Sequence, residues 1–400
     1  MNKTLKIRNF GPIREGYNRN DGYIEFTKVM VLCGPQAAGK SCVAKLYSMF
    51  SWIEKALVRG DFSEKYLMGY NRFVNTYCAY QSIQNYFNND TFLHYRGVAY
   101  EMIYNNGRLE VKANGNIDYL RPQITYIPAE RNILSVLEKA ENVKGLPAPL
   151  NTLMDEFTAA SRNMKGSKEL PIDHVSYRYD KLNKLAWIES DGYSLKLSET
   201  SSGMQSITPL FIVLDYLSRN LGVKETSMSL KEREEIKKRI DEVLKDDTLD
   251  AETRKLLINQ ISDTSNKYLL SIVEEPEQNL YPSSQRYILN SLLAINSAEN
   301  NQLVITTHSP YIINYLSLAI KAGSILPNLS PSKVNSLDKI VPTASVTDGK
   351  DVSVLEISKD GKIKDIVKYD GMPSDENVLN MFLAECNDLF GQLLEIEDGV

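Results

Sequence analysis

The sequence has no long apolar run, no closely paired cysteines and no excess of basic residues. A membrane-spanning helix needs about 20 consecutive apolar residues, so we expect no membrane partner. The opening residues, Met1 to Ile7, lack the apolar core of a secretion signal. The four cysteines show no CxxC spacing, which favours free thiols in a reducing compartment. We therefore expect a cytoplasmic protein.

The charge balance also excludes a class of proteins. The chain carries 46 basic and 51 acidic residues, a net charge of −5. This argues against a protein that coats nucleic acid, although a local basic groove stays possible and DNA binding is left open. The apolar fraction of 42% over 400 residues is that of a protein with a packed core. The length allows one large domain or two ordinary ones.

A glycine-rich segment is the most informative motif. It follows the apolar run Val29 to Cys33, a pattern typical of a buried strand, and precedes Cys42 and a helical pattern from Val43 to Leu57. It reads Gly34-Pro35-Gln36-Ala37-Ala38-Gly39-Lys40-Ser41. In a phosphate-binding loop the glycines let backbone N–H groups curl around phosphate oxygens, the lysine reaches the β- and γ-phosphates, and the serine binds Mg²⁺. The segment predicts ATP and Mg²⁺ as ligands; an ordinary glycine turn is the alternative.

Acidic residues and a histidine follow two further buried-strand patterns. Glu274 and Glu275 end the run that starts at Leu269, and His308 ends the run that starts at Leu303. Ligands gather at the carboxyl ends of strands in parallel α/β sheets. One carboxylate is expected to bind Mg²⁺ and the other to activate the attacking water, while the histidine contacts the γ-phosphate or that water. The alternatives are a surface acidic turn and a histidine bonded to backbone groups.

Taken together, these motifs resemble those of ABC-type ATPases, in particular the soluble branch of the SMC, RecF and OLD proteins. The segment Leu5 to Ile13, which includes Arg8, is similar to the first strand and nucleotide-flanking loop of that branch. The segment Ser201-Ser202-Gly203-Met204-Gln205 is similar to the signature motif, and Glu277 to Pro282 to the D-loop. The resemblance implies that Glu275 is the catalytic glutamate and His308 the switch histidine.

The resemblance also implies an assembly. Two copies would enclose two ATP molecules, and Ser202, Gly203 and Gln205 of one copy would complete the site around Lys40 of the other. Three positions depart from the family pattern: Ser202 replaces a glycine, Glu274 replaces an aspartate, and Tyr281 replaces a histidine. The Q-loop glutamine is not obvious. Gln123, before the Tyr126 to Arg131 stretch, is our candidate metal ligand.

The expected fold class is α/β, an ABC ATPase head with a mixed sheet around a phosphate-loop helix. We expect four parts: residues 1–223 from the opening strand to the signature, an inserted helical hairpin at 224–267, residues 268–335 with Glu274 to His308, and a small C-terminal α+β extension at 336–400. The hairpin is either a solvated decoration or an interaction surface. The final helical pattern, from about Ser374, has a wide apolar face that is either core or a contact with a partner or a further copy.

The order of motifs resembles the stand-alone ATPase subunits of two-gene anti-phage systems such as PARIS and Septu, which have a separate Toprim- or HNH-type nuclease. This implies a nuclease partner and a phage protein as trigger. Only about 85 residues follow the His308 strand, so we expect no nuclease domain here. The alternatives are a RecF-like DNA-repair ATPase and a cassette that energises a transporter.

Overall fold

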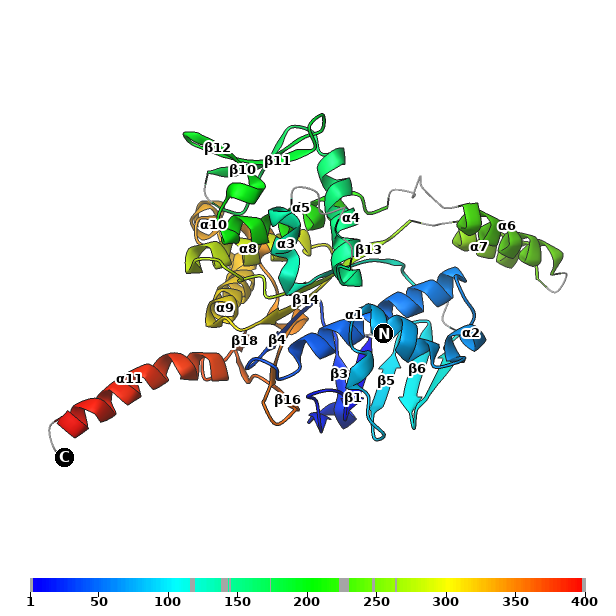
Figure 1. The fold of residues 1–400 in the computed structure, drawn as a ribbon, viewed down its shortest axis with the longest axis horizontal. Helices are drawn as coiled ribbons and strands as arrows, with labels where there is room; N and C mark the ends of the chain where they lie inside the picture. Colours follow the sequence, from blue (N-terminus) through cyan, green and yellow to red (C-terminus); the bar gives the residue numbers. More distant parts are fainter. Residues whose placement is uncertain are drawn as a thin grey trace.

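The computed structural model describes residues 3–115, 119–137, 143, 145–172, 174–222, 230–246, 249–262 and 265–397 (Figure 1). A seven-stranded sheet forms the centre. Its strands, in spatial order, are β2 (Gly16–Tyr17), β16 (Lys362–Asp365), β15 (Val352–Ile357), β4 (Val29–Cys33), β14 (Gln302–Thr307), β13 (Tyr268–Glu274) and β8 (Pro122–Ile127). The five strands from β15 to β8 run parallel, and β16 is antiparallel to β15.

The register of the parallel strands sets where the site lies. Thr307 is opposite Cys33, Glu274 is opposite Thr306, and Ile127 is opposite Val273. The carboxyl ends of β4, β14, β13 and β8 therefore meet at one edge of the sheet. The residues that follow these strands are brought together there although they are far apart in sequence.

Both faces of β4 are buried, as its uninterrupted apolar sequence predicts. Val29, Val31 and Cys33 point into one core, and Met30 and Leu32 into the other, because successive side chains of a strand alternate. The expected class, α/β with a mixed sheet around a phosphate-loop helix, is confirmed.

On one face, α1 (Lys40–Arg59) packs between the central sheet and a five-stranded antiparallel sheet. That sheet has the order β3 (Tyr23–Glu25), β1 (Thr4–Arg8), β5 (Phe92–Arg96), β6 (Tyr100–Asn105) and β7 (Arg108–Ala113). The β6–β7 turn has positive φ at Asn106 (48°) and Gly107 (75°), as a two-residue hairpin of this type requires. The short α2 (Glu64–Met68) contacts β7.

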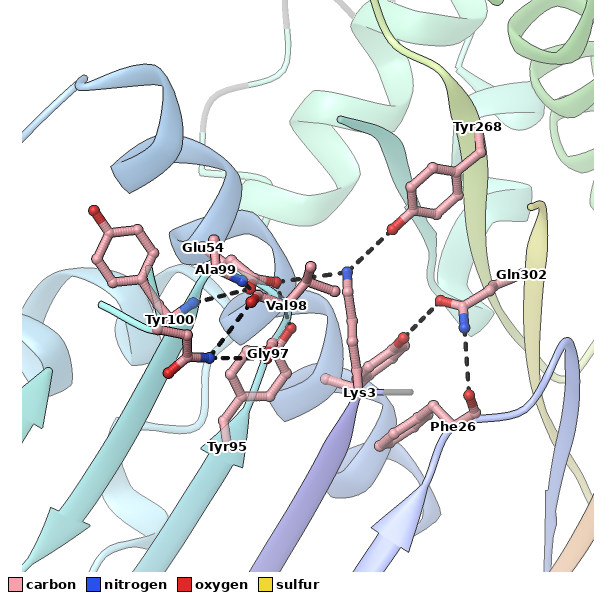
Figure 2. A network of polar contacts seen from close by, with 12 residues as sticks. Lys3, Phe26, Glu54, Tyr95, Gly97, Val98, Ala99, Tyr100, Tyr268 and Gln302 are labelled. Carbon is pink, nitrogen blue, oxygen red and sulfur yellow. Dashed lines mark hydrogen bonds and ion pairs between the residues drawn. The ribbon is translucent and has the colours of Figure 1, made fainter. Parts of the chain in front are cut away.

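A buried polar network ties these layers together (Figure 2). Lys3 Nζ donates to the Tyr268 hydroxyl on β13 at 3.1 Å and lies 3.7 Å from Glu54 Oε2 on α1. Glu54 also accepts from the Ala99 N–H at 2.7 Å and from the Tyr95 hydroxyl at 2.8 Å. A buried charge is costly unless it is paired and hydrogen-bonded. The network therefore fixes α1 relative to both sheets.

The opposite face of the central sheet is covered mainly by helices. These are α4 (Ala148–Asn163), α5 (Ser202–Arg219), α8 (Pro282–Ile295) and α9 (Pro310–Ile325), with the shorter α3 (Ile133–Val136) and α10 (Pro331–Asp338). Between α4 and α5 the chain forms a four-stranded antiparallel sheet, β12 (Tyr193–Lys196), β11 (Leu185–Ser190), β10 (Val175–Asp180) and β9 (Ser167–Glu169). The sheet ends just before the signature helix α5.

Two helical segments extend from this body (Figure 1). The first comprises α6 (Leu230–Lys245) and α7 (Ala251–Ser262), which contact each other as a hairpin. The start of the expected insertion, residues 224–229, and part of its turn lie outside the described residues. The second is α11 (Val378–Glu397), which follows the small β17 (Lys368–Tyr369) and β18 (Met372–Pro373) pair.

The apolar face of the last helix is only partly core. Val378 and Leu379 pack against the body, but Phe382, Leu389 and Phe390 are each more than half exposed. The C-terminal hairpin β15–β16 is present, and β15 lies directly beside β4 in the central sheet. All four cysteines are free thiols. Within the described residues, no helix combines the length and apolar character needed to cross a bilayer.

Candidate functional site

The phosphate loop joins β4 to α1, and its glycines are required by close packing. Gly34 has φ of +139°, and a Cβ there would lie 2.1 Å from the Ile357 carbonyl oxygen. Gly39 has φ of +114°, and a Cβ there would lie 2.9 Å from Ile13 Cγ1. An L side chain at either position would be strained and would clash. Pro35 is half-buried, and Gln36 and Ala37 are exposed at the tip of the loop, while Ala38 and Lys40 are buried.

The first turn of α1 continues the loop. Ser41 is half-buried and follows Lys40 directly. Cys42 is buried, and burial raises the pKa of its thiol to about 12, so the thiol stays protonated. Its N–H donates to the Gly39 carbonyl at 3.0 Å. The amino end of α1, with its positive dipole, thus faces the loop.

The side chains of Lys40, His308 and Glu275 form a row at the carboxyl edge of the sheet. Lys40 Nζ lies 3.4 Å from His308 Nδ1, and His308 Nε2 lies 3.4 Å from Glu275 Oε1. An ammonium only donates hydrogen bonds, so Nδ1 accepts and the ring proton is on Nε2, facing the carboxylate. The structure therefore brings together the three residues that the sequence marked as catalytic, although Lys40 begins α1 after β4 and the other two follow β14 and β13.

The charges in this row affect one another. The hydrogen bond from His308 holds the pKa of Glu275 below its ordinary value, against the opposing effect of burial. Burial lowers the pKa of Lys40, and the nearby carboxylates of Glu275 and Glu277 oppose that shift. Lys40 Nζ also donates to the carbonyls of Gly34 at 3.0 Å and Pro35 at 2.8 Å. Glu275 is thus an ionised acceptor near neutral pH, as a general base must be.

The backbone places Glu275 in an unusual conformation. Its φ is +44°, in the left-handed region that non-glycine residues rarely adopt, and its N–H donates to the Thr306 carbonyl at 2.9 Å. Such positions persist only where the surroundings impose them, and they cluster at functional sites. The turn lifts the carboxylate off the end of β13 toward His308.

Glu277 holds the backbone of His308, the middle residue of the row. Its Oε1 accepts from the His308 N–H and from the Thr307 hydroxyl, both at 2.7 Å. Burial raises the pKa of Glu277. The sequence placed this residue only in the D-loop, because nothing local shows that it contacts the end of β14. It positions the backbone that carries the histidine.

Arg131 is a second residue whose role the sequence did not reveal. Its side chain is fully buried and donates to the carbonyls of Glu274 and Glu275, each at 2.7 Å, and of Ser206 at 3.1 Å. Burial lowers its pKa to about 10, so the guanidinium is still charged at neutral pH. Arg131 therefore links the end of β13 to the signature helix α5. The only signal in the sequence was its position, a charged residue four positions after the end of the buried strand β8.

Glu274 and Ser41 are the residues that fit Mg²⁺. Glu274 is the last residue of β13, is 5% exposed, and its Oε1 has no hydrogen-bond partner. A buried carboxylate oxygen without a partner is costly, and a cation would satisfy it. Over the described ranges no group of three or more His, Cys, Asp or Glu could hold a metal ion. Mg²⁺ would therefore depend on the nucleotide and water for its remaining oxygens, which is its usual mode of binding beside phosphates.

The signature residues lie at the start of α5, where Ser202 is exposed and Gly203 is buried. A Cβ on Gly203 would lie 2.7 Å from the Asn279 carbonyl oxygen, so this glycine allows the D-loop to pack against the signature. Gln205 is buried, and its Nε2 donates to the carbonyls of Ser198 at 3.1 Å and Thr200 at 3.0 Å. In this structure Gln205 shapes the loop before α5, and Ser202 is the residue that faces outward.

Arg8 is the last residue of β1. It is exposed and lines a hollow of about 820 Å³ together with Arg14, Arg19 and Lys362. The intervening segment packs on the loop, since Pro12 and Ile13 contact Gly39. The hollow carries more basic than acidic side chains, which suits an anionic ligand.

The prediction that Gln123 binds the metal is wrong. Gln123 is the second residue of β8, so it lies at the amino end of a strand whose carboxyl end, at Ile127, reaches the site. Four residues of extended strand separate the two by roughly 13 Å. The Gln123 Oε1 instead accepts from Asn266 Nδ2 at 2.6 Å. The sequence did not show which end of the strand faces the phosphate loop.

A family model described as an AAA ATPase domain matches residues 130–313. The match covers less than half of the chain and begins after the phosphate loop, so the loop geometry is independent evidence. The chain is an ATP hydrolase. None of the curated proteins compared with this ATPase matches it.

Solved structures show distant similarity to the ATPase. The SMC head domain from Thermotoga maritima is 11% identical, with 79% of this chain and 92% of that chain covered at a TM-score of 0.35. An Smc head domain derived from Pyrococcus furiosus is 11% identical, with 91% and 95% covered and a TM-score of 0.36. A bacterial ABC transporter cassette, solved as a dimer, is 8% identical, with 92% and 100% covered and a TM-score of 0.29.

Proposed function

We propose that this ATPase is of the ABC type and hydrolyses ATP at composite sites between two copies, with Glu275 as the general base. The observation that carries the proposal is the row Lys40–His308–Glu275 at the end of the phosphate-loop strand. The backbone N–H groups of the loop and Lys40 hold the β- and γ-phosphates. Ser41 and Glu274 would hold Mg²⁺, which would supply charge neutralisation at those phosphates when bound.

The remaining roles follow from the contacts within the chain. Glu275 accepts a proton from the attacking water, and its lowered pKa keeps it ionised for that purpose. His308 orients Glu275 through Nε2 and senses the phosphate side through Lys40. Glu277 and Arg131 hold the backbone on either side of this pair. Ser202, exposed at the start of α5, would contact the γ-phosphate bound to the other copy.

Two substitutions test the catalytic assignment. In Lys40→Ala the phosphates lose their main cation, so ATP binding measured by titration calorimetry should disappear. In Glu275→Gln, ATP binding should persist while the rate of phosphate release falls at least ~100-fold, the usual effect of losing a general base. Glu110→Gln, on the exposed face of β7, is a matched control that should change neither quantity. Turnover at the wild-type rate in Glu275→Gln would remove Glu275 from the mechanism.

We further propose that the ATPase is the sensor or scaffold subunit of a bacterial anti-phage complex, which holds or activates a separate Toprim- or HNH-type nuclease when a phage protein appears. The support is the motif resemblance, including the Tyr126 to Arg131 stretch. The product of a neighbouring nuclease gene should then co-purify with the ATPase, and phage protection should require both genes and Lys40. A nuclease that neither binds nor depends on the ATPase would refute this role.

The RecF-like alternative makes a different prediction. A DNA-clamping ATPase should hydrolyse ATP faster with DNA, and the stimulation should fall steeply with salt because phosphate contacts release counterions. The net charge of −5 counts against it, whereas the basic hollow around Arg8 counts for it. ATPase assays with and without duplex DNA at two salt concentrations separate the two roles.

A further inference from the structure

The last helix, α11, carries a large apolar face outside the body of the molecule. The first residues of the helix, which we call its root, are anchored to the body. The Val378 N–H lies 3.4 Å from Glu356 Oε2, and Leu379 is 7% exposed. Beyond the root the helix leaves the body (Figure 1). Seven large apolar side chains there are between 45% and 74% exposed: Met381, Phe382, Leu389, Phe390, Leu393, Leu394 and Ile396. Most of the stability of a helix in a protein comes from packing of its apolar face, so this face needs a cover.

The spacing of the face is that of a coiled coil. Leu379, Phe382, Cys386, Leu389, Leu393 and Ile396 follow one another at alternating intervals of three and four residues. This 3.5-residue average is the a/d pattern by which two parallel helices pack side chains into each other. At 100° per residue, Asp388 and Glu395 fall on the opposite side of the helix. We call this row of a and d residues the seam. Such a seam is complementary to the same seam on a second copy of the helix.

The charge of the helix limits which kind of partner could cover its apolar face. The segment Val378–Glu397 contains four acidic residues and no basic one. Anionic lipid surfaces and nucleic acids attract basic helices, so neither fits this face. A protein surface remains, and the seam requires one that presents a matching row of apolar side chains.

The position of the root favours a second copy over a foreign protein. Glu356, which contacts the Val378 N–H, is opposite Cys33 in the register of β15 and β4. The next residue, Ile357, packs against Gly34 of the phosphate loop. Thus α11 starts at the edge of the sheet where the proposed composite sites bring two copies together. If two copies met at that edge, the first residues of their α11 helices would lie on the same side of the pair, and the two helices could run side by side in the same direction.

The exposed area is just large enough for a dimer. Five exposed large side chains lie on or beside this seam: Phe382, Leu389, Phe390, Leu393 and Ile396. At roughly 100 Å² of exposed apolar surface each, two copies would remove on the order of 1,000 Å² from water, about the smallest area expected of a specific interface. We propose that α11 pairs in parallel with α11 of a second copy and that this dimer persists without nucleotide. The placement rests on the proposed ATP interface, whereas the helix pairing does not need ATP.

The test is the mass of the full chain without nucleotide, measured by light scattering. Wild type and Lys40→Ala should both be dimers. The double substitution Leu389→Asp with Leu393→Asp, which puts charges into the seam, should weaken self-association at least ~100-fold and give monomers. Asn387→Asp adds one negative charge outside the a/d seam and should remain dimeric, as should wild type, whereas Leu389→Asp alone should already weaken the dimer. A monomeric wild type, or a dimeric double variant, overturns the proposal.

Cys386 provides a second measurement. In a parallel pair it faces its counterpart at an a position, within disulfide range, so mild oxidation should yield a covalent dimer that Cys386→Ser abolishes. No cross-link in a dimeric wild type overturns the parallel pairing. The ATP interface is tested apart: Glu275→Gln combined with the seam double variant should still dimerise when ATP is added. If it does so while the wild type is monomeric without ATP, the proposed function stands and the α11 inference fails.

Discussion

The guanidinium of Arg131 connects two parts of the site that lie 75 and 143 residues away from it in the sequence. It holds the carbonyls of Glu274 and Glu275 and, through Ser206, the start of the signature helix. The backbone of Glu275, with its positive φ, is therefore fixed from both sides: by the Thr306 carbonyl and by Arg131. The carboxylate of Glu275, the proposed general base, depends on this clamp for its position.

Arg131→Lys should separate positioning from folding. A lysine keeps the charge but cannot donate to three carbonyls in the planar geometry of a guanidinium. We expect the turnover number to fall at least ~10-fold while the KM for ATP stays within about threefold, because the loss acts on the orientation of Glu275 rather than on the phosphate loop. Steady-state kinetics measure this, with thermal unfolding to confirm a folded protein. Arg178→Lys, a half-exposed residue on β10, is the control.

Residues with local requirements could be predicted from the sequence, and residues with distant partners could not. Gly34 to Ser41 form a motif whose order and spacing are sufficient, and Glu275 and His308 each end an apolar run. Gln123 was misplaced because its position depends on which end of β8 faces the site, which only the pairing of β8 with β13 decides. The contacts of Glu277 and Arg131 cross between strands and leave no pattern in their own neighbourhood.

The same division holds for helices and strands. The strand β4 and the helix α1 were predicted because each shows its own periodicity around the glycine loop. The location of β15 beside β4 was not, since strand pairing over more than 300 residues has no local signal. The solvent exposure of the outer part of α11 could not be predicted either, because the sequence of an apolar face is the same whether the face is core or interface.

The contact between α4 and β8 makes stability depend on pH. Burial raises the pKa of Glu156 on α4 to about 7, although the Thr125 hydroxyl on β8 donates to its Oε2 at 2.8 Å. An acid whose folded-state pKa lies above its unfolded-state value of about 4.3 stabilises the folded state only while protonated. Stability should therefore fall as the pH rises from about 5 through about 7.

Glu156→Gln tests this relation, because glutamine keeps an acceptor for Thr125 and removes the charge. The variant should unfold at nearly the wild-type temperature at pH 5 and at a higher temperature at pH 8. The difference should be on the order of 1–2 kcal/mol, since the side chain is half-buried and water screens part of the effect. Thermal unfolding followed by circular dichroism at both pH values measures it. If the variant and the wild type differed in unfolding temperature by the same amount at pH 5 and pH 8, Glu156 would not be the titrating group.

Two copies that share their sites should rescue each other's defects. Lys40→Ala lacks the phosphate cation but keeps its signature, and Ser202→Arg blocks the signature but keeps its loop. Each alone should be inactive. In an equal mixture half of the dimers contain one of each, and one of their two sites is intact, so about a quarter of wild-type activity should return.

Phosphate release from the mixture, after incubation long enough for exchange of copies, measures this recovery. Mixing Lys40→Ala with Glu275→Gln is the negative control, since both substitutions affect the same half of a composite site and no pairing restores it. A mixture of Lys40→Ala and Ser202→Arg that stays inactive would mean that each copy completes its own site.

The order of strands in the central sheet has a consequence for the synthesis of the protein. The strand β4, which leads into the phosphate loop, is made early, but both of its neighbours, β14 and β15, leave the ribosome more than 260 residues later. Likewise, the Lys3 ammonium meets Tyr268 only 265 residues further on. A nascent chain therefore carries the fully apolar strand β4 without either of its sheet neighbours for most of its translation. At about 5–20 residues per second, that exposure lasts for tens of seconds, which makes chaperone protection valuable during synthesis.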